Sequence, residues 1–397
     1  MAVSQYAALI ESAFDFAQSQ VKTLIEKHPG YYPMYTHKGK WKHEGEKWTH
    51  WCDGFLGGQM WIFYQHTRDV FWLEQAKRYS KTLEARQHDR SVHDLGFIFF
   101  STYLRWLESM QASAALNENA VGVPAPAMES QHLDNVLIQA GTTLSLRFKE
   151  KGQYLRSFVS DESLFIDIMM NVGIIFYASK KQKERGRLDE SAELLRIANA
   201  HCRTSARTLV RGDGSTAHEA IFSLESGECL RQSTQQGFRA DSCWSRGLAW
   251  ALYGFCSAYR FTADTSYLDL SEACARFYIA HTPAHGIPPW DYDAQPLESR
   301  EMEDSSAAAI AASGLYDLSL VSATFEKRLL YRQYFRTIMA TLCGSSENYL
   351  GRAPGWEGIL KHGVYHLHKS LGVDESVMWG EYFFVEALSK ALNDNAF

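Results

Sequence analysis

Two aspartates in this sequence stand where they could act as a pair of catalytic carboxyl groups. Asp94 begins DLGFIFF and Asp167 begins DIMMNVGII, and both stretches are almost entirely apolar. An aspartate at a helix N-terminus is more often a cap than a catalyst, but a cap would not need such hydrophobic surroundings. Two carboxylates in a partly desolvated cleft repel each other, so one keeps its proton to higher pH. The pair would then supply the acid that sugar-cleaving chemistry requires. The helix dipole opposes this effect, because it favours the ionised form and lowers the pKa of an aspartate at a helix N-terminus.

Further polar and aromatic side chains lie in stretches that precede or begin other apolar segments. Arg246 and Trp250 are four residues apart at the start of SRGLAWALYGF, so they share a face on a helix. An arginine beside a tryptophan could pair a sugar carboxylate and stack on its ring. A structural salt bridge and a core tryptophan are an equally good interpretation of these two residues. Stretches of the same kind hold Trp48, Trp51, Phe55, His218, Gln236, Trp290 and Asp291.

Helix is expected to dominate the elements that position these residues, because proline is scarce and few windows alternate apolar with polar residues. Amphipathic helices are predicted over residues 5–26, 69–87, 131–149, 188–210, 265–281 and 323–343. Six other segments are apolar or small on nearly every side and begin at Asp53, Asp94, Asp167, Ser245, Asp304 and Ser376. The two kinds of segment alternate six times along the chain.

This alternation predicts an all-α fold, an (α/α)6 toroid in which six outer helices surround six inner helices. Residues 1–397 would form a single domain. The inner helices would run parallel, so their polar starts and the long loops before them meet at one mouth, where functional residues usually lie. Asp94 and Asp167 begin neighbouring inner helices and should face each other there. The 11 Trp, 20 Tyr and 22 Phe are a weak hint of carbohydrate binding, although packing between helices explains most of them.

Charge, hydropathy and cysteine usage exclude several classes of function. The net charge of −6 provides no basic face for nucleic acid or an anionic membrane, and no apolar stretch approaches the roughly 20 residues that span a bilayer. The first residues do not resemble a signal peptide, and seven scattered cysteines without a CxxC pair suit reduced thiols in the cytoplasm. Two groups of histidines, at residues 281–285 and 362–368, lack a recognised metal spacing, so we expect neither a metal nor another cofactor.

Six stretches of the chain carry a resemblance to a known family. They are HDLGF, IDIMMN, QQG followed by WSRGLAWALYGF, DSSAAAIAASGL, LKHGVY and WGEYFFVEAL. In this order they resemble the unsaturated glucuronyl hydrolases of glycoside hydrolase family 88, over the whole chain. The resemblance implies an (α/α)6 barrel without a metal. It also implies hydration of the vinyl ether in a 4,5-unsaturated uronic acid at the non-reducing end of small, lyase-generated oligosaccharides of the glycosaminoglycan type.

Roles for individual residues follow from the same resemblance. Asp167 matches the family's acid/base and Asp94 its partner, so we expect Asp167 to hold the raised pKa and donate the proton while Asp94 stays charged. The residues expected to contact the substrate are Trp51, Phe55, His93, His218, Gln236, Arg246 and Trp250. Phe158 departs from the pattern, because it stands where a stacking tryptophan is common. The stretch HLHKSL lacks the serines and lysine of members that prefer sulfated substrates, although His366 and Lys369 could meet an anion.

Two other interpretations of the sequence stay open. The unsaturated rhamnogalacturonyl hydrolases share this fold and chemistry and act on pectin-derived disaccharides, while the surroundings of Asp94 and Asp167 favour the glucuronyl family. A non-catalytic toroid could use the same aromatic mouth to bind a sugar or a protein, with both aspartates as helix caps. We expect no nucleic-acid or membrane partner, and a monomer or a weak homodimer.

Overall fold

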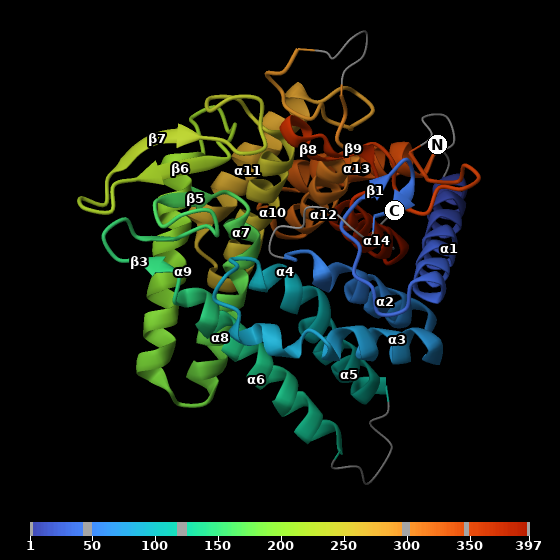
Figure 1. Ribbon diagram of the computed structural model, residues 1–397, viewed down its shortest axis with the longest axis horizontal. Coiled ribbons are helices and arrows are strands. Elements are labelled where there is room, and N and C mark those ends of the chain that lie inside the picture. The colour runs from blue at the N-terminus through green and yellow to red at the C-terminus, as the bar shows by residue number, and fades with distance from the viewer. Residues whose placement is uncertain (1–2, 43–49, 117–124, 296–301, 345–348, 395–397) are drawn as a thin grey trace.

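Two concentric rings of helices make up the fold (Figure 1). The computed structural model describes residues 3–42, 50–116, 125–295, 302–344 and 349–394. Within these ranges the inner ring consists of α2 (Asp53–Thr67), α4 (Leu95–Phe99) continued by the π-helical turn η2 (Phe100–Leu104) and α5 (Arg105–Leu116), α7 (Ile168–Asn171) continued by α8 (Gly173–Glu184), α10 (Ser245–Thr262), α12 (Ser305–Val321) and α14 (Met378–Leu392). The outer ring consists of α1 (Val3–Lys27), α3 (Val70–Lys81), α6 (Ala125–Ser145), α9 (Leu188–Leu209), α11 (Thr265–His281) and α13 (Phe325–Cys343).

The inner ring is closed, because each inner segment contacts the next along the chain and α14 contacts α2. The two rings differ in how they bury side chains. The outer helix α9 buries a stripe that includes Leu194, Ile197 and Cys202 and keeps its charged residues outside, whereas α12 is buried on nearly every side. The (α/α)6 toroid predicted from the alternation of the two kinds of segment is therefore confirmed.

Short antiparallel strands, which the sequence analysis did not predict, shape the loops that lead into the inner helices. They are β1 (Thr36–His37) with β2 (Lys40–Trp41), β3 (Phe148–Lys149) with β4 (Tyr154–Leu155), β5 (Ser163–Phe165) with β6 (Glu219–Phe222) and β7 (Cys229–Ser233), and β8 (Gly363–His366) with β9 (Leu371–Glu375). None of these strands exceeds five residues, which is too short for an alternating pattern to stand out. The pairing of β5 with β6 joins loops that are far apart in the sequence, whereas the other pairs are local hairpins.

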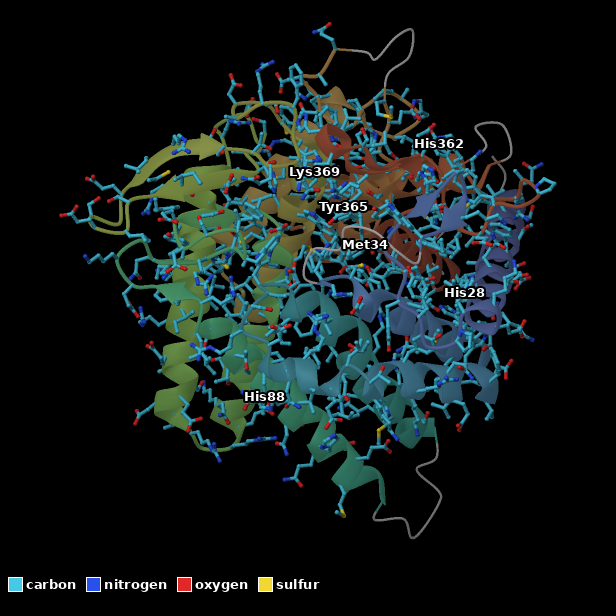
Figure 2. The ribbon with its side chains drawn as sticks, in the orientation of Figure 1. His28, Met34, His88, His362, Tyr365 and Lys369 are labelled. Atoms are coloured by element: carbon cyan, nitrogen blue, oxygen red, sulfur yellow. The ribbon has the colours of Figure 1, made fainter. Side chains whose placement is uncertain are left out.

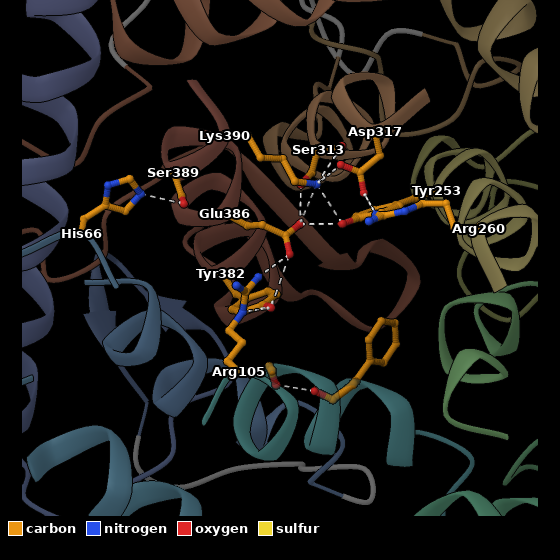
Figure 3. A network of polar contacts seen from close by, with 12 residues as sticks. His66, Arg105, Tyr253, Arg260, Ser313, Asp317, Tyr382, Glu386, Ser389 and Lys390 are labelled. Atoms are coloured by element: carbon orange, nitrogen blue, oxygen red, sulfur yellow. Dashed lines mark hydrogen bonds and ion pairs between the residues drawn. The ribbon is translucent and has the colours of Figure 1, made fainter. Parts of the chain in front are cut away.

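A network of charged side chains ties the inner helices together at the end of the barrel opposite their starts (Figure 3). Glu386 of α14 accepts hydrogen bonds from Arg105 of α5, at 2.6 Å, and from Tyr253 of α10, at 2.9 Å. Lys390 lies 2.8 Å from the carboxylate of Asp317 on α12 and 3.6 Å from that of Glu386. Burial raises the pKa of Glu386, but Lys390 and Arg105 outweigh it and lower the pKa to about 2. The buried charges therefore stabilise each other.

Replacing Glu386 by glutamine (Glu386→Gln) is expected to lower the free energy of unfolding by about 3–5 kcal/mol at pH 7, because Arg105 loses its counter-charge and Lys390 keeps only that of Asp317. The pKa of Glu386 is lower in the folded protein than its ordinary 4.5, so this stabilisation is complete above that pH and is lost as the pH falls toward 2. Urea denaturation at pH 7 and pH 3 measures the loss, which should be smaller at pH 3. Glu11→Gln, at an exposed position on α1, is the control. Equal stability of the two variants at pH 7 would contradict this role.

Candidate active site

A cavity of about 350 Å³ opens at the end of the barrel where the inner helices begin. Asp94 and Asp167 both line it, so the structure brings together the two carboxyl groups that the sequence analysis singled out. The other predicted site residues that line it are Trp51, His93, Gln236, Arg246 and Trp250. The N-termini of the inner helices point toward this end, and their combined dipoles favour a negatively charged ligand.

One imidazole N–H lies between the two carboxyl groups. Asp94 and Asp167 flank the N-termini of α4 and α7, and neither carboxylate caps its helix within the described part of the chain. Nε2 of His93 is 3.4 Å from Oδ1 of Asp94 and 3.5 Å from Oδ1 of Asp167. Its Nδ1 accepts a hydrogen bond from the backbone N–H of Phe158, at 3.0 Å. Because Nδ1 accepts, the N–H of the ring is on Nε2, which faces both carboxylates.

Asn171, the last residue of IDIMMN, holds the first turns of α4 and α7 together. Its side-chain oxygen accepts a hydrogen bond from the backbone N–H of Phe97, at 2.8 Å, and its amide donates to the backbone carbonyl of Asp167, at 3.2 Å. Gly96 permits this approach, since a Cβ atom there would lie only 2.5 Å from Cα of Asn171. Backbone contacts, rather than long side chains, thus set how far apart the two carboxyl groups lie.

His218 lies outside the set of described residues that line the cavity, but the pairing of β5 with β6 places it beside the residues that lead into Asp167. Its Nδ1 accepts hydrogen bonds from the backbone N–H groups of Gln235, at 3.1 Å, and Gln236, at 3.3 Å. Burial lowers the pKa of His218 to about 4, although the charge of Asp167 opposes the shift. The ring is therefore neutral with its proton on Nε2, a buried donor without a partner among the described residues.

The two carboxyl groups differ in exposure and in pKa. The side chain of Asp94 is 4 % exposed and that of Asp167 is 15 % exposed. Burial raises the pKa of Asp94 to about 6, with His93 opposing the rise and the charge of Asp167 adding to it. Burial also raises the pKa of Asp167, but His93, His218 and Arg246 together bring it below its ordinary value. In the free protein the proton of the pair is therefore on Asp94.

The predicted order of the two pKa values is wrong. From the sequence we expected a raised pKa for Asp167 and an ionised Asp94. In the free protein the pKa of Asp94 is raised and that of Asp167 is lowered. Both residues precede an apolar helix, so the sequence around each of them looks alike. The pKa of Asp167 is lowered first by His93 and then by His218, on the loop before β6, and Arg246, on α10, and all three approach Asp167 only in the folded chain.

The guanidinium of Arg246 is bound on both sides by groups of the protein. Its Nη1 donates to the carboxylate of Asp304, at 3.1 Å, and to the backbone carbonyl of Val364. Its Nη2 donates to Oε1 of Gln236, at 2.5 Å, and to the backbone carbonyl of Tyr365, at 2.9 Å. The structural salt bridge that the sequence left open is thus present. These four bonds occupy the Nη hydrogens that were expected to pair a sugar carboxylate.

The aromatic candidates divide into cavity walls and core. Trp51 and Trp250 line the cavity, each with its ring against Phe97, at 5.6 and 5.0 Å between ring centroids. Phe55, by contrast, is 1 % exposed and lies outside the set of described residues that line the cavity. Its ring packs beneath that of Phe97, at 5.4 Å. The predicted contact of Phe55 with the substrate is therefore corrected: it supports the cavity floor.

Phe158 borders the cavity and stacks on His93, with 5.2 Å between the ring centroids. It provides an aromatic face at the position where the resemblance raised the question of a missing tryptophan. Two further residues that line the cavity, Trp244 and Tyr365, were not predicted as site residues. Trp244 begins the stretch WSRGLAWALYGF and Tyr365 ends the stretch LKHGVY. Tyr365 lies on β8. Lys369 lies on the turn η3 (Leu367–Lys369) and also lines the cavity; both residues are labelled in Figure 2.

Other candidates have structural places or cannot be placed. Trp290 is buried, and the carboxylate of Asp291 accepts hydrogen bonds from the backbone N–H of Phe238 and from Ser242, both within 2.8 Å. Trp48 lies outside the described residues. Within the described ranges, no three His, Cys, Asp or Glu side chains gather closely enough to hold a metal ion, and no helix is long and apolar enough to cross a membrane.

The sequence of this chain is similar to those of enzymes that act on unsaturated sugars. No family model matches it. It is 30% identical over 345 residues to an unsaturated glucuronyl hydrolase from Bacillus sp. (strain GL1), covering 86% of this chain and 85% of the relative. The chain belongs to the unsaturated glucuronyl hydrolase family. Members of this family are hydrolases, so the chain is a glycoside hydrolase-type enzyme.

Other members of the unsaturated glucuronyl hydrolase family agree with this assignment. An unsaturated chondroitin disaccharide hydrolase from Streptococcus pneumoniae is 27% identical, over 87% of this chain and 83% of the relative. The crystal structure of an unsaturated glucuronyl hydrolase specific for heparin superposes with a TM-score of 0.82 at 27% identity, covering 97% of both chains. The structure of the Bacillus sp. GL1 enzyme superposes with a TM-score of 0.81 at 25% identity, covering 96% of both.

The raised pKa of Asp94 predicts that the ionised carboxylate lowers the stability of the folded protein. Because the folded pKa of about 6 exceeds the ordinary 3.8, the stabilisation by protonated Asp94 is complete below pH about 4 and is lost as the pH rises through 6. An amide does not ionise, so Asp94→Asn should raise the melting temperature by a few degrees at pH 8 and leave it unchanged at pH 4. Calorimetry of both proteins measures this.

The control for that comparison is Asp241→Asn, in the loop before α10, where the carboxylate is fully exposed. This variant should melt with the wild-type protein at pH 8. A melting temperature of Asp94→Asn equal to that of the wild-type protein at pH 8 would show that ionised Asp94 is not a buried, destabilising charge.

Proposed function

We propose that the cavity binds the terminal 4,5-unsaturated uronic acid of a lyase-generated oligosaccharide and hydrates its C4=C5 double bond. The observation that carries the proposal is the pair of carboxyl groups, Asp94 and Asp167, placed on either side of one His93 N–H in a largely aromatic cavity. The names of the relatives, unsaturated glucuronyl hydrolase and unsaturated chondroitin disaccharide hydrolase, support the same class of substrate.

The charge of the cavity supports an anionic substrate. The inner helices direct their N-termini to this end, and the positive charge of Lys369 borders the same space. The rings of Trp51 and Trp250 offer flat apolar faces for the sugar rings. A uronate combines an apolar ring face with a carboxylate, and the cavity therefore suits both parts of this substrate.

In the proposed reaction, Asp167 transfers its proton to C4 of the substrate, and positive charge develops at C5 and the ring oxygen. Ionised Asp94 stabilises this charge. Water then adds its oxygen to C5 while Asp167, now a base, takes up one of the water's protons. The resulting hemiketal opens by breaking the bond between C5 and the ring oxygen, which leaves a ketone at C5 and a hemiacetal at C1. Collapse of the hemiacetal to an aldehyde releases the neighbouring sugar as an alcohol.

Asp167 is the proposed donor even though the proton of the free protein lies on Asp94. Its side chain is the more exposed of the two and can reach a ligand in the cavity. A bound substrate covers Asp167 and adds the negative charge of its own carboxylate, and both effects raise the pKa of Asp167. The pair then holds its proton at Asp167 and leaves the charge on Asp94.

The alternatives from the sequence make different predictions. Pectin-derived unsaturated disaccharides are less consistent with the names of the relatives, and a comparison of lyase products from chondroitin, hyaluronan, heparin and pectin decides between the two classes. A non-catalytic toroid would leave both aspartates as helix caps, whereas neither carboxylate caps its helix among the described residues.

We further infer one domain over residues 1–397 and a monomer or weak homodimer. We also infer a cytoplasmic location, which the seven free thiols support.

Replacing the proposed donor by Asp167→Asn is expected to lower kcat/KM by at least about a thousandfold, because the amide cannot deliver a proton to C4. Loss of the ultraviolet absorbance of the conjugated double bond measures turnover of an unsaturated chondroitin disaccharide. Asp241→Asn should keep wild-type activity. Retention of most of the activity by Asp167→Asn would contradict the assignment of the donor.

The pH dependence of the reaction is expected to follow the titration of the pair. Activity requires one proton on the pair, so kcat/KM, which reports the free enzyme, should fall as the pH rises above about 6. The bound carboxylate raises the pKa values, so kcat should decline only at higher pH. Steady-state kinetics from pH 4 to 9 measures the pH dependence of both kcat/KM and kcat. A kcat/KM that stays level from pH 5 to 8 would rule out the shared proton.

A further inference from the structure

Asp304 lies outside the cavity but connects three elements that surround it. It is fully buried at the start of α12, where its Oδ1 accepts the backbone N–H of Ser306, at 3.0 Å, and that of Val364 on β8, at 3.3 Å. Its Oδ2 accepts from Nη1 of Arg246 on α10, at 3.1 Å. The side chains of this ion pair are 0 % and 2 % exposed, so neither charge has water as an alternative partner.

Arg246 transmits this constraint to the cavity wall. Its guanidinium lies over the rings of Trp244, at 4.3 Å, and Trp379, at 5.1 Å, which restrict its movement. Its Nη2 donates to Oε1 of Gln236, at 2.5 Å. Since a guanidinium can only donate, the oxygen of this amide must face Arg246 and the NH2 group must face away. Gln236 lines the cavity and therefore offers amide donors to a ligand there.

We propose that Asp304 is a positioning residue, which through Arg246 turns the amide donors of Gln236 toward the carboxylate of the bound uronate. Without Asp304 the guanidinium loses its buried counter-charge, and the orientation of Gln236 is no longer determined. This inference rests on the proposed function, because it concerns how the same cavity recognises its substrate.

Asp304→Asn is the test variant. Asparagine keeps an oxygen that can cap α12 and replaces the oxygen bound by Arg246 with an NH2 group, which cannot accept. We expect kcat/KM for an unsaturated chondroitin disaccharide to fall roughly tenfold to a hundredfold, mainly through a higher KM. Asp264→Asn is the matched control, because Asp264 caps α11 by accepting from the backbone N–H of Ser266, at 3.0 Å, in the same Asp-x-Ser arrangement. It should leave both constants unchanged.

A double-mutant cycle separates positioning from general damage to the fold. If Asp304 acts through Gln236, Asp304→Asn should cause little further loss of kcat/KM in a protein that already carries Gln236→Ala. The loss should also shrink for the methyl ester of the same substrate, which has no uronate charge to recognise. Losses that multiply in the cycle, or an unchanged KM in Asp304→Asn, would overturn the proposal.

Should Asp304→Asn fail to fold, Asp304→Asn with Arg246→Met takes its place in the cycle, since that pair of changes leaves no unpaired buried charge. The same coupling to Gln236→Ala is expected, and its absence overturns the proposal. The proposed function and the positioning role of Asp304 can fail separately. No turnover by the wild-type protein would overturn the proposed function and this inference with it. Turnover by the wild type with a normal KM in the variant would overturn the inference alone.

Discussion

The close contact of α4 with α7 at Gly96 and Asn171 is the constraint on which the site depends. It allows the side chain of Asn171 to bridge the backbones of the two helices, at 2.8 and 3.2 Å, and so fixes the positions from which Asp94 and Asp167 extend. His93 can then lie between both carboxylates with a single N–H. A larger residue than glycine at position 96 would push the helices apart, and the two carboxyl groups would no longer share one proton donor.

The parallel arrangement of the inner helices gives the barrel two electrically different ends. At the mouth, helix N-termini favour negative charge, which suits a uronate and two acidic side chains. Toward the opposite end, Lys390 lies in the last turn of α14, where a helix C-terminus favours a cation, and together with Arg105 it surrounds Glu386 (Figure 3). The network around Glu386 stabilises the fold, whereas Asp94 at the mouth destabilises it when ionised. Such opposition is common where a site needs a strained or costly group.

The sequence predicted the scaffold better than the chemistry of the site. Alternating amphipathic and apolar segments were enough for the two rings, because burial is periodic in the chain. The pKa order of the two aspartates was not predictable, because His93, His218 and Arg246 reach Asp167 from distant segments. The burial of Phe55 and the four acceptors around Arg246 depend likewise on tertiary contacts that no local pattern records. Strands of two to five residues, such as β5 and β6, leave no readable period.

In the proposed reaction, the paired carboxyl groups hydrate a double bond and do not displace a group at the anomeric carbon. One turnover in water labelled with heavy oxygen, followed at once by borohydride reduction and mass spectrometry, locates the oxygen that the water supplies. Hydration places the label at C5 of the uronate product and leaves the old ring oxygen on C1. A label at C1 would contradict the account, because it would show attack of water at the anomeric carbon.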